Sequence, residues 1–288
     1  MNPQNFCSIS QYASEIIGYE KYDSAFKLHL RAARAFLGLP KNVASFGLIS
    51  ELDWLLPQFQ SQIKMIQHFG RIMCTPSNRL LYRIYVWDRN LAESGQIITW
   101  SSEVKSILYQ HNLAKIFDDE QIFHTKEITL KLKTSMYEMQ QQIIKNECKN
   151  KPKLRTFMLF KDFGPLPPHV GKPLSFVERK SISKLRLGIL PLRIETARYA
   201  RPILPENQRV CYCESGEIES EYHAMFSCSK YDSLRDAWLR RVCTPANFHE
   251  LEMKEKFKIV LNRPENARLT AQYIVAFMDL RCLINKAY

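Results

Sequence analysis

The chain has 288 residues, of which 45% are hydrophobic and 24% are charged, and its formal net charge is +12. This length allows one large domain or two ordinary ones, and the composition is that of a protein that folds around a hydrophobic core. No apolar run reaches the roughly eighteen residues of a membrane-spanning helix, and the N-terminus lacks the basic and apolar regions of a secretory signal. We therefore expect an intracellular protein, nuclear or cytoplasmic, that is neither secreted nor inserted in a membrane.

The distribution of cysteine and charge narrows the class further. Five of the eight cysteines are scattered without the spacing of a disulfide framework, which favours a reducing compartment. The excess of positive charge favours a polyanionic partner, so we expect the chain to bind RNA and/or DNA.

Helices are the secondary structure that the apolar pattern predicts. Glycine is scarce, with 9 residues, and apolar side chains recur at intervals of three and four. The segments with this pattern begin near residues 23, 63, 80, 101, 125, 175, 231, 248 and 269. Asp23 is a candidate N-cap of the first, and Gly38 is placed to end it. Ser175 and Glu178 form a capping box, and Gly188 is placed to end that helix. We predict an all-α, mainly helical fold.

Two of these helices carry more specific expectations. In the helix from residue 80, Leu80, Ile84, Trp87 and Leu91 recur at intervals of four, three and four, and the helix is expected to end near Gly95. Ser101 or Ser102 is expected to cap the next helix.

A change of composition divides the chain. Residues 149–161 contain five basic residues and no acid, and residues 164–173 contain four prolines. A segment so rich in proline cannot form one helix and is typical of a linker. We predict a helical domain at 1–148, a basic Pro-rich linker at 149–174, and a basic helical domain at 175–288 with a small knuckle-like insertion at 209–231.

The insertion carries a candidate metal site. Cys211, Cys213, His223 and Cys228 offer three thiolates and an imidazole, the soft ligand set of a structural zinc ion. The His-x4-Cys half has the spacing of a zinc knuckle, whereas Cys-x-Cys is one residue shorter than the usual Cys-x2-Cys. On an extended strand Cys211 and Cys213 would still point to the same side. The alternative is a set of buried or idle thiols beside a surface histidine.

The densest positive charge lies just before this cluster. Eight basic and two acidic residues between positions 179 and 209 give a net charge of 8 − 2 = +6. The residues expected to contact phosphates are Arg179, Lys180, Lys184, Arg186, Arg193, Arg198 and Arg201. Tyr199 is a candidate for stacking on a base or for packing. The cluster itself has four glutamates, at positions 214, 217, 219 and 221, so we expect any anion-binding surface to precede it.

A second, smaller basic stripe runs along the first helix. Lys27, Arg31 and Arg34 lie beside its apolar face, where they could follow a phosphate backbone. A solvated face of lysine and arginine is the alternative.

Motifs of catalysis are missing from the sequence. It contains no Gly-rich phosphate loop, no nucleophile elbow and no His-Glu-x-x-His. Asp118 and Asp119 follow Phe117 without the intervening residue of a polymerase motif, and we interpret them as a solvated helix start. We expect a protein without enzymatic activity, although a nuclease site assembled from dispersed acids remains an alternative.

The order of several segments resembles one family. Residues 31–41 (RAARAFLGLPK) and 47–54 (GLISELDW) resemble the region after the polymerase palm in non-LTR (LINE-type) retrotransposon reverse transcriptases. Residues 183–188 (SKLRLG), 194–202 (IETARYARP) and 209–235 resemble the C-terminal segment of the same polyproteins, and residues 112–152 match least.

The resemblance implies a polymerase-free C-terminal piece, with a thumb-like domain at 1–148 and a zinc knuckle. In that family these segments grip template RNA and target DNA, and an upstream polymerase domain is a possible partner. The zinc ligands carry over to Cys211, Cys213, His223 and Cys228, although family members commonly have Cys-x2-Cys. The alternative function is a structural or protein-interaction remnant with neither metal nor a specific nucleic-acid ligand.

Overall fold

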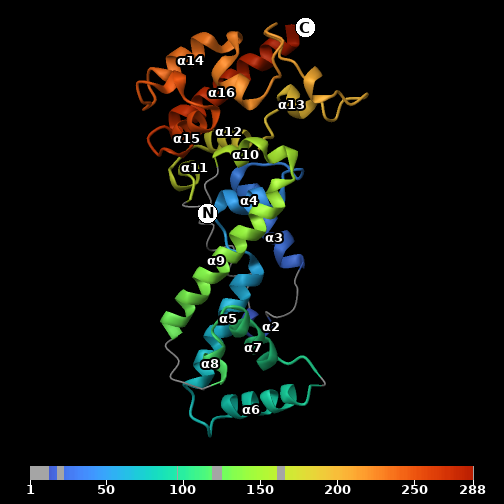
Figure 1. The fold of residues 1–288 in the computed structure, drawn as a ribbon, viewed down its shortest axis with the longest axis vertical. Helices are drawn as coiled ribbons and strands as arrows, with labels where there is room; N and C mark the ends of the chain where they lie inside the picture. Colours follow the sequence, from blue (N-terminus) through green and yellow to red (C-terminus); the bar gives the residue numbers. More distant parts are fainter. Residues whose placement is uncertain (1–12, 18–22, 96, 119–124, 161–165, 288) are drawn as a thin grey trace. The chain divides into compact units, whose positions relative to one another are not determined.

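The computed structural model describes residues 13–17, 23–95, 97–118, 125–160 and 166–287. Within these residues the fold is all-α, as predicted, and none of them belongs to a β-strand (Figure 1). Val210 and Ile218 form an isolated antiparallel β-bridge.

The chain divides into two compact units, each built from two stretches of sequence. Unit 1 comprises residues 1–32 and 55–143, and unit 2 comprises residues 33–54 and 144–288. The division differs from the predicted boundary, because residues 33–54 belong with the C-terminal part of the chain. A buried ion pair between Glu51 and Arg186 is one reason for this grouping.

Unit 1 is a set of helices around one apolar core. Its helices are α2 (Ser14–Ile17), the first part of α3 (Asp23–Leu37), α5 (Pro57–Met73), α6 (Leu80–Glu93), α7 (Trp100–Gln110), α8 (Ala114–Asp118) and most of α9 (Thr125–Lys149). Helix α5 packs against α2, α6 and α7. At the centre, the ring centroid of Phe69 lies 5.8 Å from those of Tyr85 and Phe117.

Helix α6 forms where predicted but presents its apolar face to solvent. Leu80, Ile84 and Trp87 are 70%, 52% and 65% exposed, whereas Tyr85 is 3% exposed. The periodicity thus predicted the helix correctly, whereas the side chain of α6 that packs into the core is Tyr85, through its ring contact with Phe69.

Helix α7 begins with a different cap from the expected one. Thr99, not Ser101 or Ser102, is the N-cap, and Ser102 completes the capping box.

The acidic residues after Phe117 were predicted to begin a helix. Asp118 is instead the last residue of helix α8, and residues 119 and 120 lie outside the described residues.

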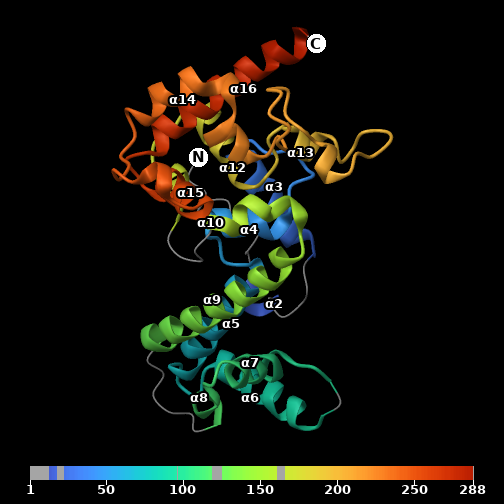
Figure 2. The same ribbon diagram turned by 45° about the horizontal axis from the view of Figure 1, so that its top comes forward.

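Unit 2 holds the candidate site. Its helices are α4 (Ser45–Leu52), α10 (Arg155–Phe160), α11 (Pro168–Gly171), α12 (Phe176–Arg186), α13 (Arg193–Thr196), α14 (Asp232–Leu239), α15 (Met253–Asn262) and α16 (Ala267–Ala287), with 3-10 turns at Pro152–Leu154, Glu206–Gln208, Ser229–Tyr231 and Phe248–Glu250 and a π-turn at His223–Ser227. Helix α16 packs against α12 and α14 (Figure 2).

Helix α12 has both the capping box and the terminating glycine that the sequence predicts. Ser175 accepts from the backbone N–H of Glu178, whose carboxylate accepts from the N–H of Ser175. Gly188 has a φ of 63°, and a Cβ on it would lie 2.1 Å from the backbone oxygen of Lys153. Only glycine therefore fits this turn.

The described residues of 149–174, predicted to be a linker, instead contribute buried side chains to the unit 2 core. They contain the turn Pro152–Leu154 and the helices α10 and α11. Leu154, Phe157 and His169 are fully buried. Pro152 and Pro168 each lie in the first turn of a short helix rather than keeping the chain extended, since proline is well suited to that position.

Candidate metal centre

The four predicted metal ligands come together in unit 2. Their ligand atoms all lie within 4.8 Å of one another. The Sγ atoms of Cys211 and Cys228 are 3.7 Å apart, and Cys213 Sγ is 3.2 Å from Nε2 of His223. A tetrahedral ion with metal–sulfur bonds of about 2.3 Å requires sulfurs about 3.8 Å apart. The cluster could hold one metal ion with this geometry.

A tight turn compensates for the short Cys-x-Cys spacing. The N–H of Cys211 donates to the carbonyl of Glu217 over 2.7 Å, beside the bridge between Val210 and Ile218. Between these bonds, Glu214 and Gly216 have φ values of 65° and 74°. This left-handed backbone turns the chain back within a few residues. Cys213 therefore reaches the site from the turn, whereas Cys211 reaches it from the bridge.

The His-x4-Cys half is set by a π-turn. Residues His223–Ser227 form this turn, and the N–H of Cys228 donates to the carbonyl of His223 over 2.8 Å. An i to i+5 hydrogen bond brings residues five apart close together, which is the separation of the two ligands. Such single π-turns are frequent at functional sites.

The cluster is mostly closed to solvent. Cys211, His223 and Cys228 are 7%, 3% and 0% exposed, and Cys213 is half-buried. Four protein ligands in a buried position are typical of a structural metal site, because a catalytic site keeps a position open for water or substrate.

Glu217 orients the imidazole ligand. Its Oε2 lies 2.5 Å from Nδ1 of His223, so the carboxylate accepts the proton of that nitrogen. Nε2, which lies 3.2 Å from Sγ of Cys213, is then the nitrogen that faces the cluster and would bind a metal. A carboxylate on the second nitrogen of a metal-binding histidine is a common supporting contact, since it fixes the tautomer and the ring orientation.

The ionisable groups of the cluster change one another's pKa values. The contact with Cys228, together with burial, raises the pKa of Cys211 to about 12. The same contact with Cys211 lowers the pKa of Cys228. Burial lowers the pKa of His223, but Cys211 and Glu217 outweigh it and raise this pKa to about 9. A metal requires thiolates and a neutral imidazole, so its binding would displace the protons that these groups share.

Two buried glutamates attach the metal-binding segment to the helices around it. Glu219, 1% exposed, accepts two hydrogen bonds from Arg281 of helix α16, at 2.6 and 2.7 Å. Glu221, also 1% exposed, accepts from Arg155 over 2.6 Å and from Thr156 over 3.0 Å. The four glutamates therefore do not form one acidic surface, since only those at 214 and 217 are exposed.

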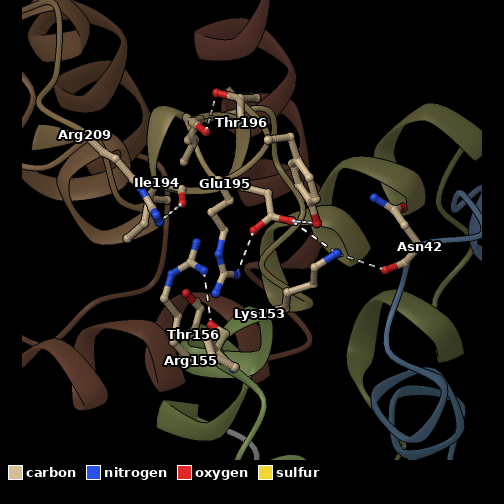
Figure 3. A network of polar contacts seen from close by, with 12 residues as sticks. Asn42, Lys153, Arg155, Thr156, Ile194, Glu195, Thr196 and Arg209 are labelled. Atoms are coloured by element: carbon tan, nitrogen blue, oxygen red, sulfur yellow. Dashed lines mark hydrogen bonds and ion pairs between the residues drawn. The ribbon is translucent and has the colours of Figure 1, made fainter. Parts of the chain in front are cut away.

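The same segment also holds the middle of the basic stretch, at Arg193 and Ile194. Glu219 also accepts from the backbone N–H of Arg193 over 2.6 Å, and its own carbonyl accepts from the N–H of Ile194. Arg209 donates to the carbonyl of Ile194 over 3.0 Å (Figure 3). Hydrogen bonds thus connect the metal-binding segment to Arg193 and Ile194 of helix α13.

Arg186 must be removed from the expected phosphate contacts. Its side chain is 1% exposed, and its Nε lies 2.5 Å from Oε1 of Glu51. It also donates to Asn262 Oδ1 over 3.1 Å. The residue is an internal ion-pair partner, and the sequence could not show this because Glu51 lies 135 positions away.

The other predicted basic residues differ in exposure. Arg179 is half-buried, donates to the carbonyl of Phe36 over 3.0 Å, and lies 4.4 Å from its ring centroid. Lys180, Lys184, Arg193 and Arg198 are also half-buried, and Arg201 is exposed. On helix α3, Lys27 and Arg31 are exposed, whereas Arg34 is half-buried and burial lowers its pKa.

Lys153 is a basic residue that the sequence did not connect with the stretch 179–209, although it lies beside Glu195 and Tyr199. Lys153 lies 3.5 Å from Glu195, which also pairs with Arg198 at 3.2 Å (Figure 3). Its ammonium is 5.2 Å from the ring centroid of Tyr199. The structure therefore places Lys153, Arg198 and Tyr199 around one buried carboxylate. The five basic residues at 149–161 were noted in the sequence, but nothing there connected them to position 195.

Among the described residues, no helix combines the length and the hydrophobicity needed to cross a bilayer. Comparison of the chain with family models, with curated proteins and with solved structures gave no match in any of the three.

Proposed function

We propose that the cluster binds one zinc ion with a structural role. The observation that carries this proposal is the convergence of three thiols and one imidazole within 4.8 Å. Thiolate and imidazole are ligands that zinc prefers in four-coordinate structural sites, and burial of three of the four favours a closed site. Because the segment also holds Arg193, Ile194 and Arg281, the ion would stabilise the packing of unit 2 around it.

Elemental analysis of the purified chain tests the zinc site. We expect one zinc per chain, lost in Cys228→Ser and retained in Cys74→Ser, because Cys74 is an exposed cysteine outside the cluster. Zinc that is absent from the wild type, or equally present in both variants, would contradict the proposal.

We further propose that the chain binds nucleic acid without catalysing a reaction. Three features support this: the net charge of +12, the exposed Lys27, Arg31 and Arg201, and the hydrogen bond between the metal-binding segment and the backbone of Arg193. The sequence resemblance to the C-terminal part of LINE-type reverse transcriptases agrees with such a role. In this proposal the chain grips the backbone of template RNA or target DNA for an upstream polymerase domain.

Salt dependence tests the binding proposal. Contacts with phosphates release counterions, so affinity should fall by roughly one log unit per log unit of salt for each neutralised phosphate. Fluorescence anisotropy with labelled RNA and labelled duplex DNA, repeated at several salt concentrations, measures this slope. A wild-type affinity that is negligible, or that barely changes with salt, would leave the structural or protein-interaction alternative.

A further inference from the structure

A hollow in the surface of unit 2 has the side chains of an anion-binding site. Its volume is about 360 Å³. It lies among the segment before helix α4, the segment between α9 and α10, and the residues that follow α13. Its lining includes the polar and aromatic residues Asn42, Asn150, Lys151, Lys153, Arg198 and Tyr199.

The hollow is positively charged, and its cations are held in place. Lys151, Lys153 and Arg198 bring three positive charges, against two negative charges, one from the buried Glu195 and one from Glu147 beside Lys151. Lys153 also donates to the carbonyl of Asn42 over 3.3 Å (Figure 3). Lys151 is 40% exposed and pairs with the exposed Glu147 at 3.3 Å. An anion that enters the hollow therefore meets cations that are already positioned, which lowers the entropic cost of binding.

Tyr199 adds an exposed aromatic surface beside these cations. Tyr199 is 59% exposed, and its hydroxyl donates to Oε1 of Glu195 over 3.4 Å. The ring is thus fixed at its hydroxyl end by the same carboxylate that positions Lys153 and Arg198. Aromatic rings next to a basic groove are the means by which proteins bind single-stranded nucleic acids, because each unpaired base has a face that can stack.

We propose that this hollow binds one unpaired nucleotide of a single-stranded nucleic acid. The phosphate contacts Lys151, Lys153 and Arg198, and the base stacks on Tyr199. The amides of Asn42 and Asn150 supply donors and acceptors for the sugar or the base edge. The volume lies within the range of small-molecule pockets, about 300–1,000 Å³, so it has room for a nucleotide but not for a duplex.

This inference rests on the proposed nucleic-acid binding and specifies the form of the nucleic acid. In a duplex the bases are stacked on one another and are not available to a tyrosine ring. The hollow should therefore distinguish single strands from duplexes, whereas phosphate contacts alone would not.

The test compares the full zinc-loaded chain with two variants at position 199. Binding is measured by anisotropy with fluorescein-labelled single strands of roughly twelve nucleotides, oligo-uridine and oligo-thymidine, and with a duplex of the same length. We expect Tyr199→Ala to weaken single-strand binding about 10-fold and Tyr199→Phe to preserve it, because phenylalanine keeps the stacking face. Duplex affinity should not change. The two single strands distinguish RNA from DNA as the natural ligand.

Matched variants control for charge and folding. Tyr109→Ala removes an exposed tyrosine of unit 1 and should leave single-strand binding unchanged. Lys151→Glu reverses a partly exposed charge in the hollow and should weaken binding to single strands. Circular dichroism and zinc content confirm that each variant folds.

The outcomes separate the two proposals. If the wild type binds no nucleic acid, the proposed function fails. If the wild type binds and Tyr199→Ala has the same affinity for single strands, the hollow is not the binding site. Equal weakening of single strands and duplexes by Tyr199→Ala would likewise overturn the inference, because a stacking contact requires an unpaired base.

Discussion

Glu219 and Arg281 form a buried, two-pronged ion pair that connects the metal-binding segment to the last helix of the chain, α16. The two oxygens of Glu219 lie 2.6 and 2.7 Å from the guanidinium of Arg281, whose pKa is raised by this contact despite its burial. The same carboxylate accepts from the backbone of Arg193. Through these contacts Glu219 connects the metal-binding segment to helix α13 and to helix α16.

Truncation of this pair should destabilise unit 2. We expect Arg281→Ala to lower the free energy of unfolding by about 3–5 kcal/mol, because Glu219 would remain buried without its counter-charge. Urea denaturation measures the change. Lys131→Ala is the control, since Lys131 and Glu127 form an exposed pair worth less than about 1 kcal/mol. Similar effects of the two variants would contradict a structural role for the buried pair.

Removal of the carboxylate behind the histidine should weaken zinc binding. Glu217→Ala is expected to lower the affinity for zinc about 10- to 100-fold while leaving one zinc per chain at saturation, because Glu217 orients His223 without binding the metal. Competition with a chelating indicator measures the affinity. The neighbouring exposed Glu214 supplies the control variant Glu214→Ala, which should retain the wild-type value.

Gly188 should not tolerate a side chain. Gly188→Ala combines a left-handed backbone with a Cβ 2.1 Å from the Lys153 oxygen, so we expect a loss of at least about 2 kcal/mol of stability. Gly95 has a similar φ of 71°, but nothing lies within 4 Å of its Cβ position. Gly95→Ala should therefore cost only the backbone strain, about 1–2 kcal/mol. Equal unfolding midpoints for both variants would show that the close approach at Gly188 is relieved at no cost.

Stability should fall in mild acid because of a buried histidine. His29 is 6% exposed, and burial lowers its pKa from 6.5 to about 4. The unfolded chain takes up a proton at this residue below pH 6.5, whereas the folded chain does not until about pH 4. Stability is therefore complete above pH 6.5 and is lost as the pH falls to 4, by on the order of 3 kcal/mol. Urea denaturation at several pH values gives the free energy of unfolding. Between pH 6.5 and 4 this free energy should vary less for His29→Leu than for His249→Leu, a control at an exposed histidine.

Two arginines of the predicted phosphate-contacting set should behave differently. Arg201 is exposed, so Arg201→Ala should reduce the salt slope of nucleic-acid binding by about one and leave stability unchanged. Arg186 is buried against Glu51, so Arg186→Ala should lower stability instead. Anisotropy and urea denaturation of both variants make this comparison. A reduced salt slope for a folded Arg186→Ala would contradict the assignment.

The sequence by itself determined the features that depend on neighbouring residues. Helix periodicity, the capping box of Ser175 and Glu178, and the stop at Gly188 all act over a few positions, and the structure contains each of them. The metal cluster was also predictable, because its four ligands lie within eighteen residues and a turn at each end suffices to bring them together.

Only the tertiary structure decided which faces are buried and which charges are paired. The sequence cannot show that Arg186 meets Glu51, that Glu219 meets Arg281, or that Lys153 meets Glu195, since these partners are 135, 62 and 42 positions apart. The exposed face of helix α6 and the burial of Leu154, Phe157 and His169 have the same cause. A local pattern states that a side chain is apolar or charged, whereas its partner depends on how distant helices pack.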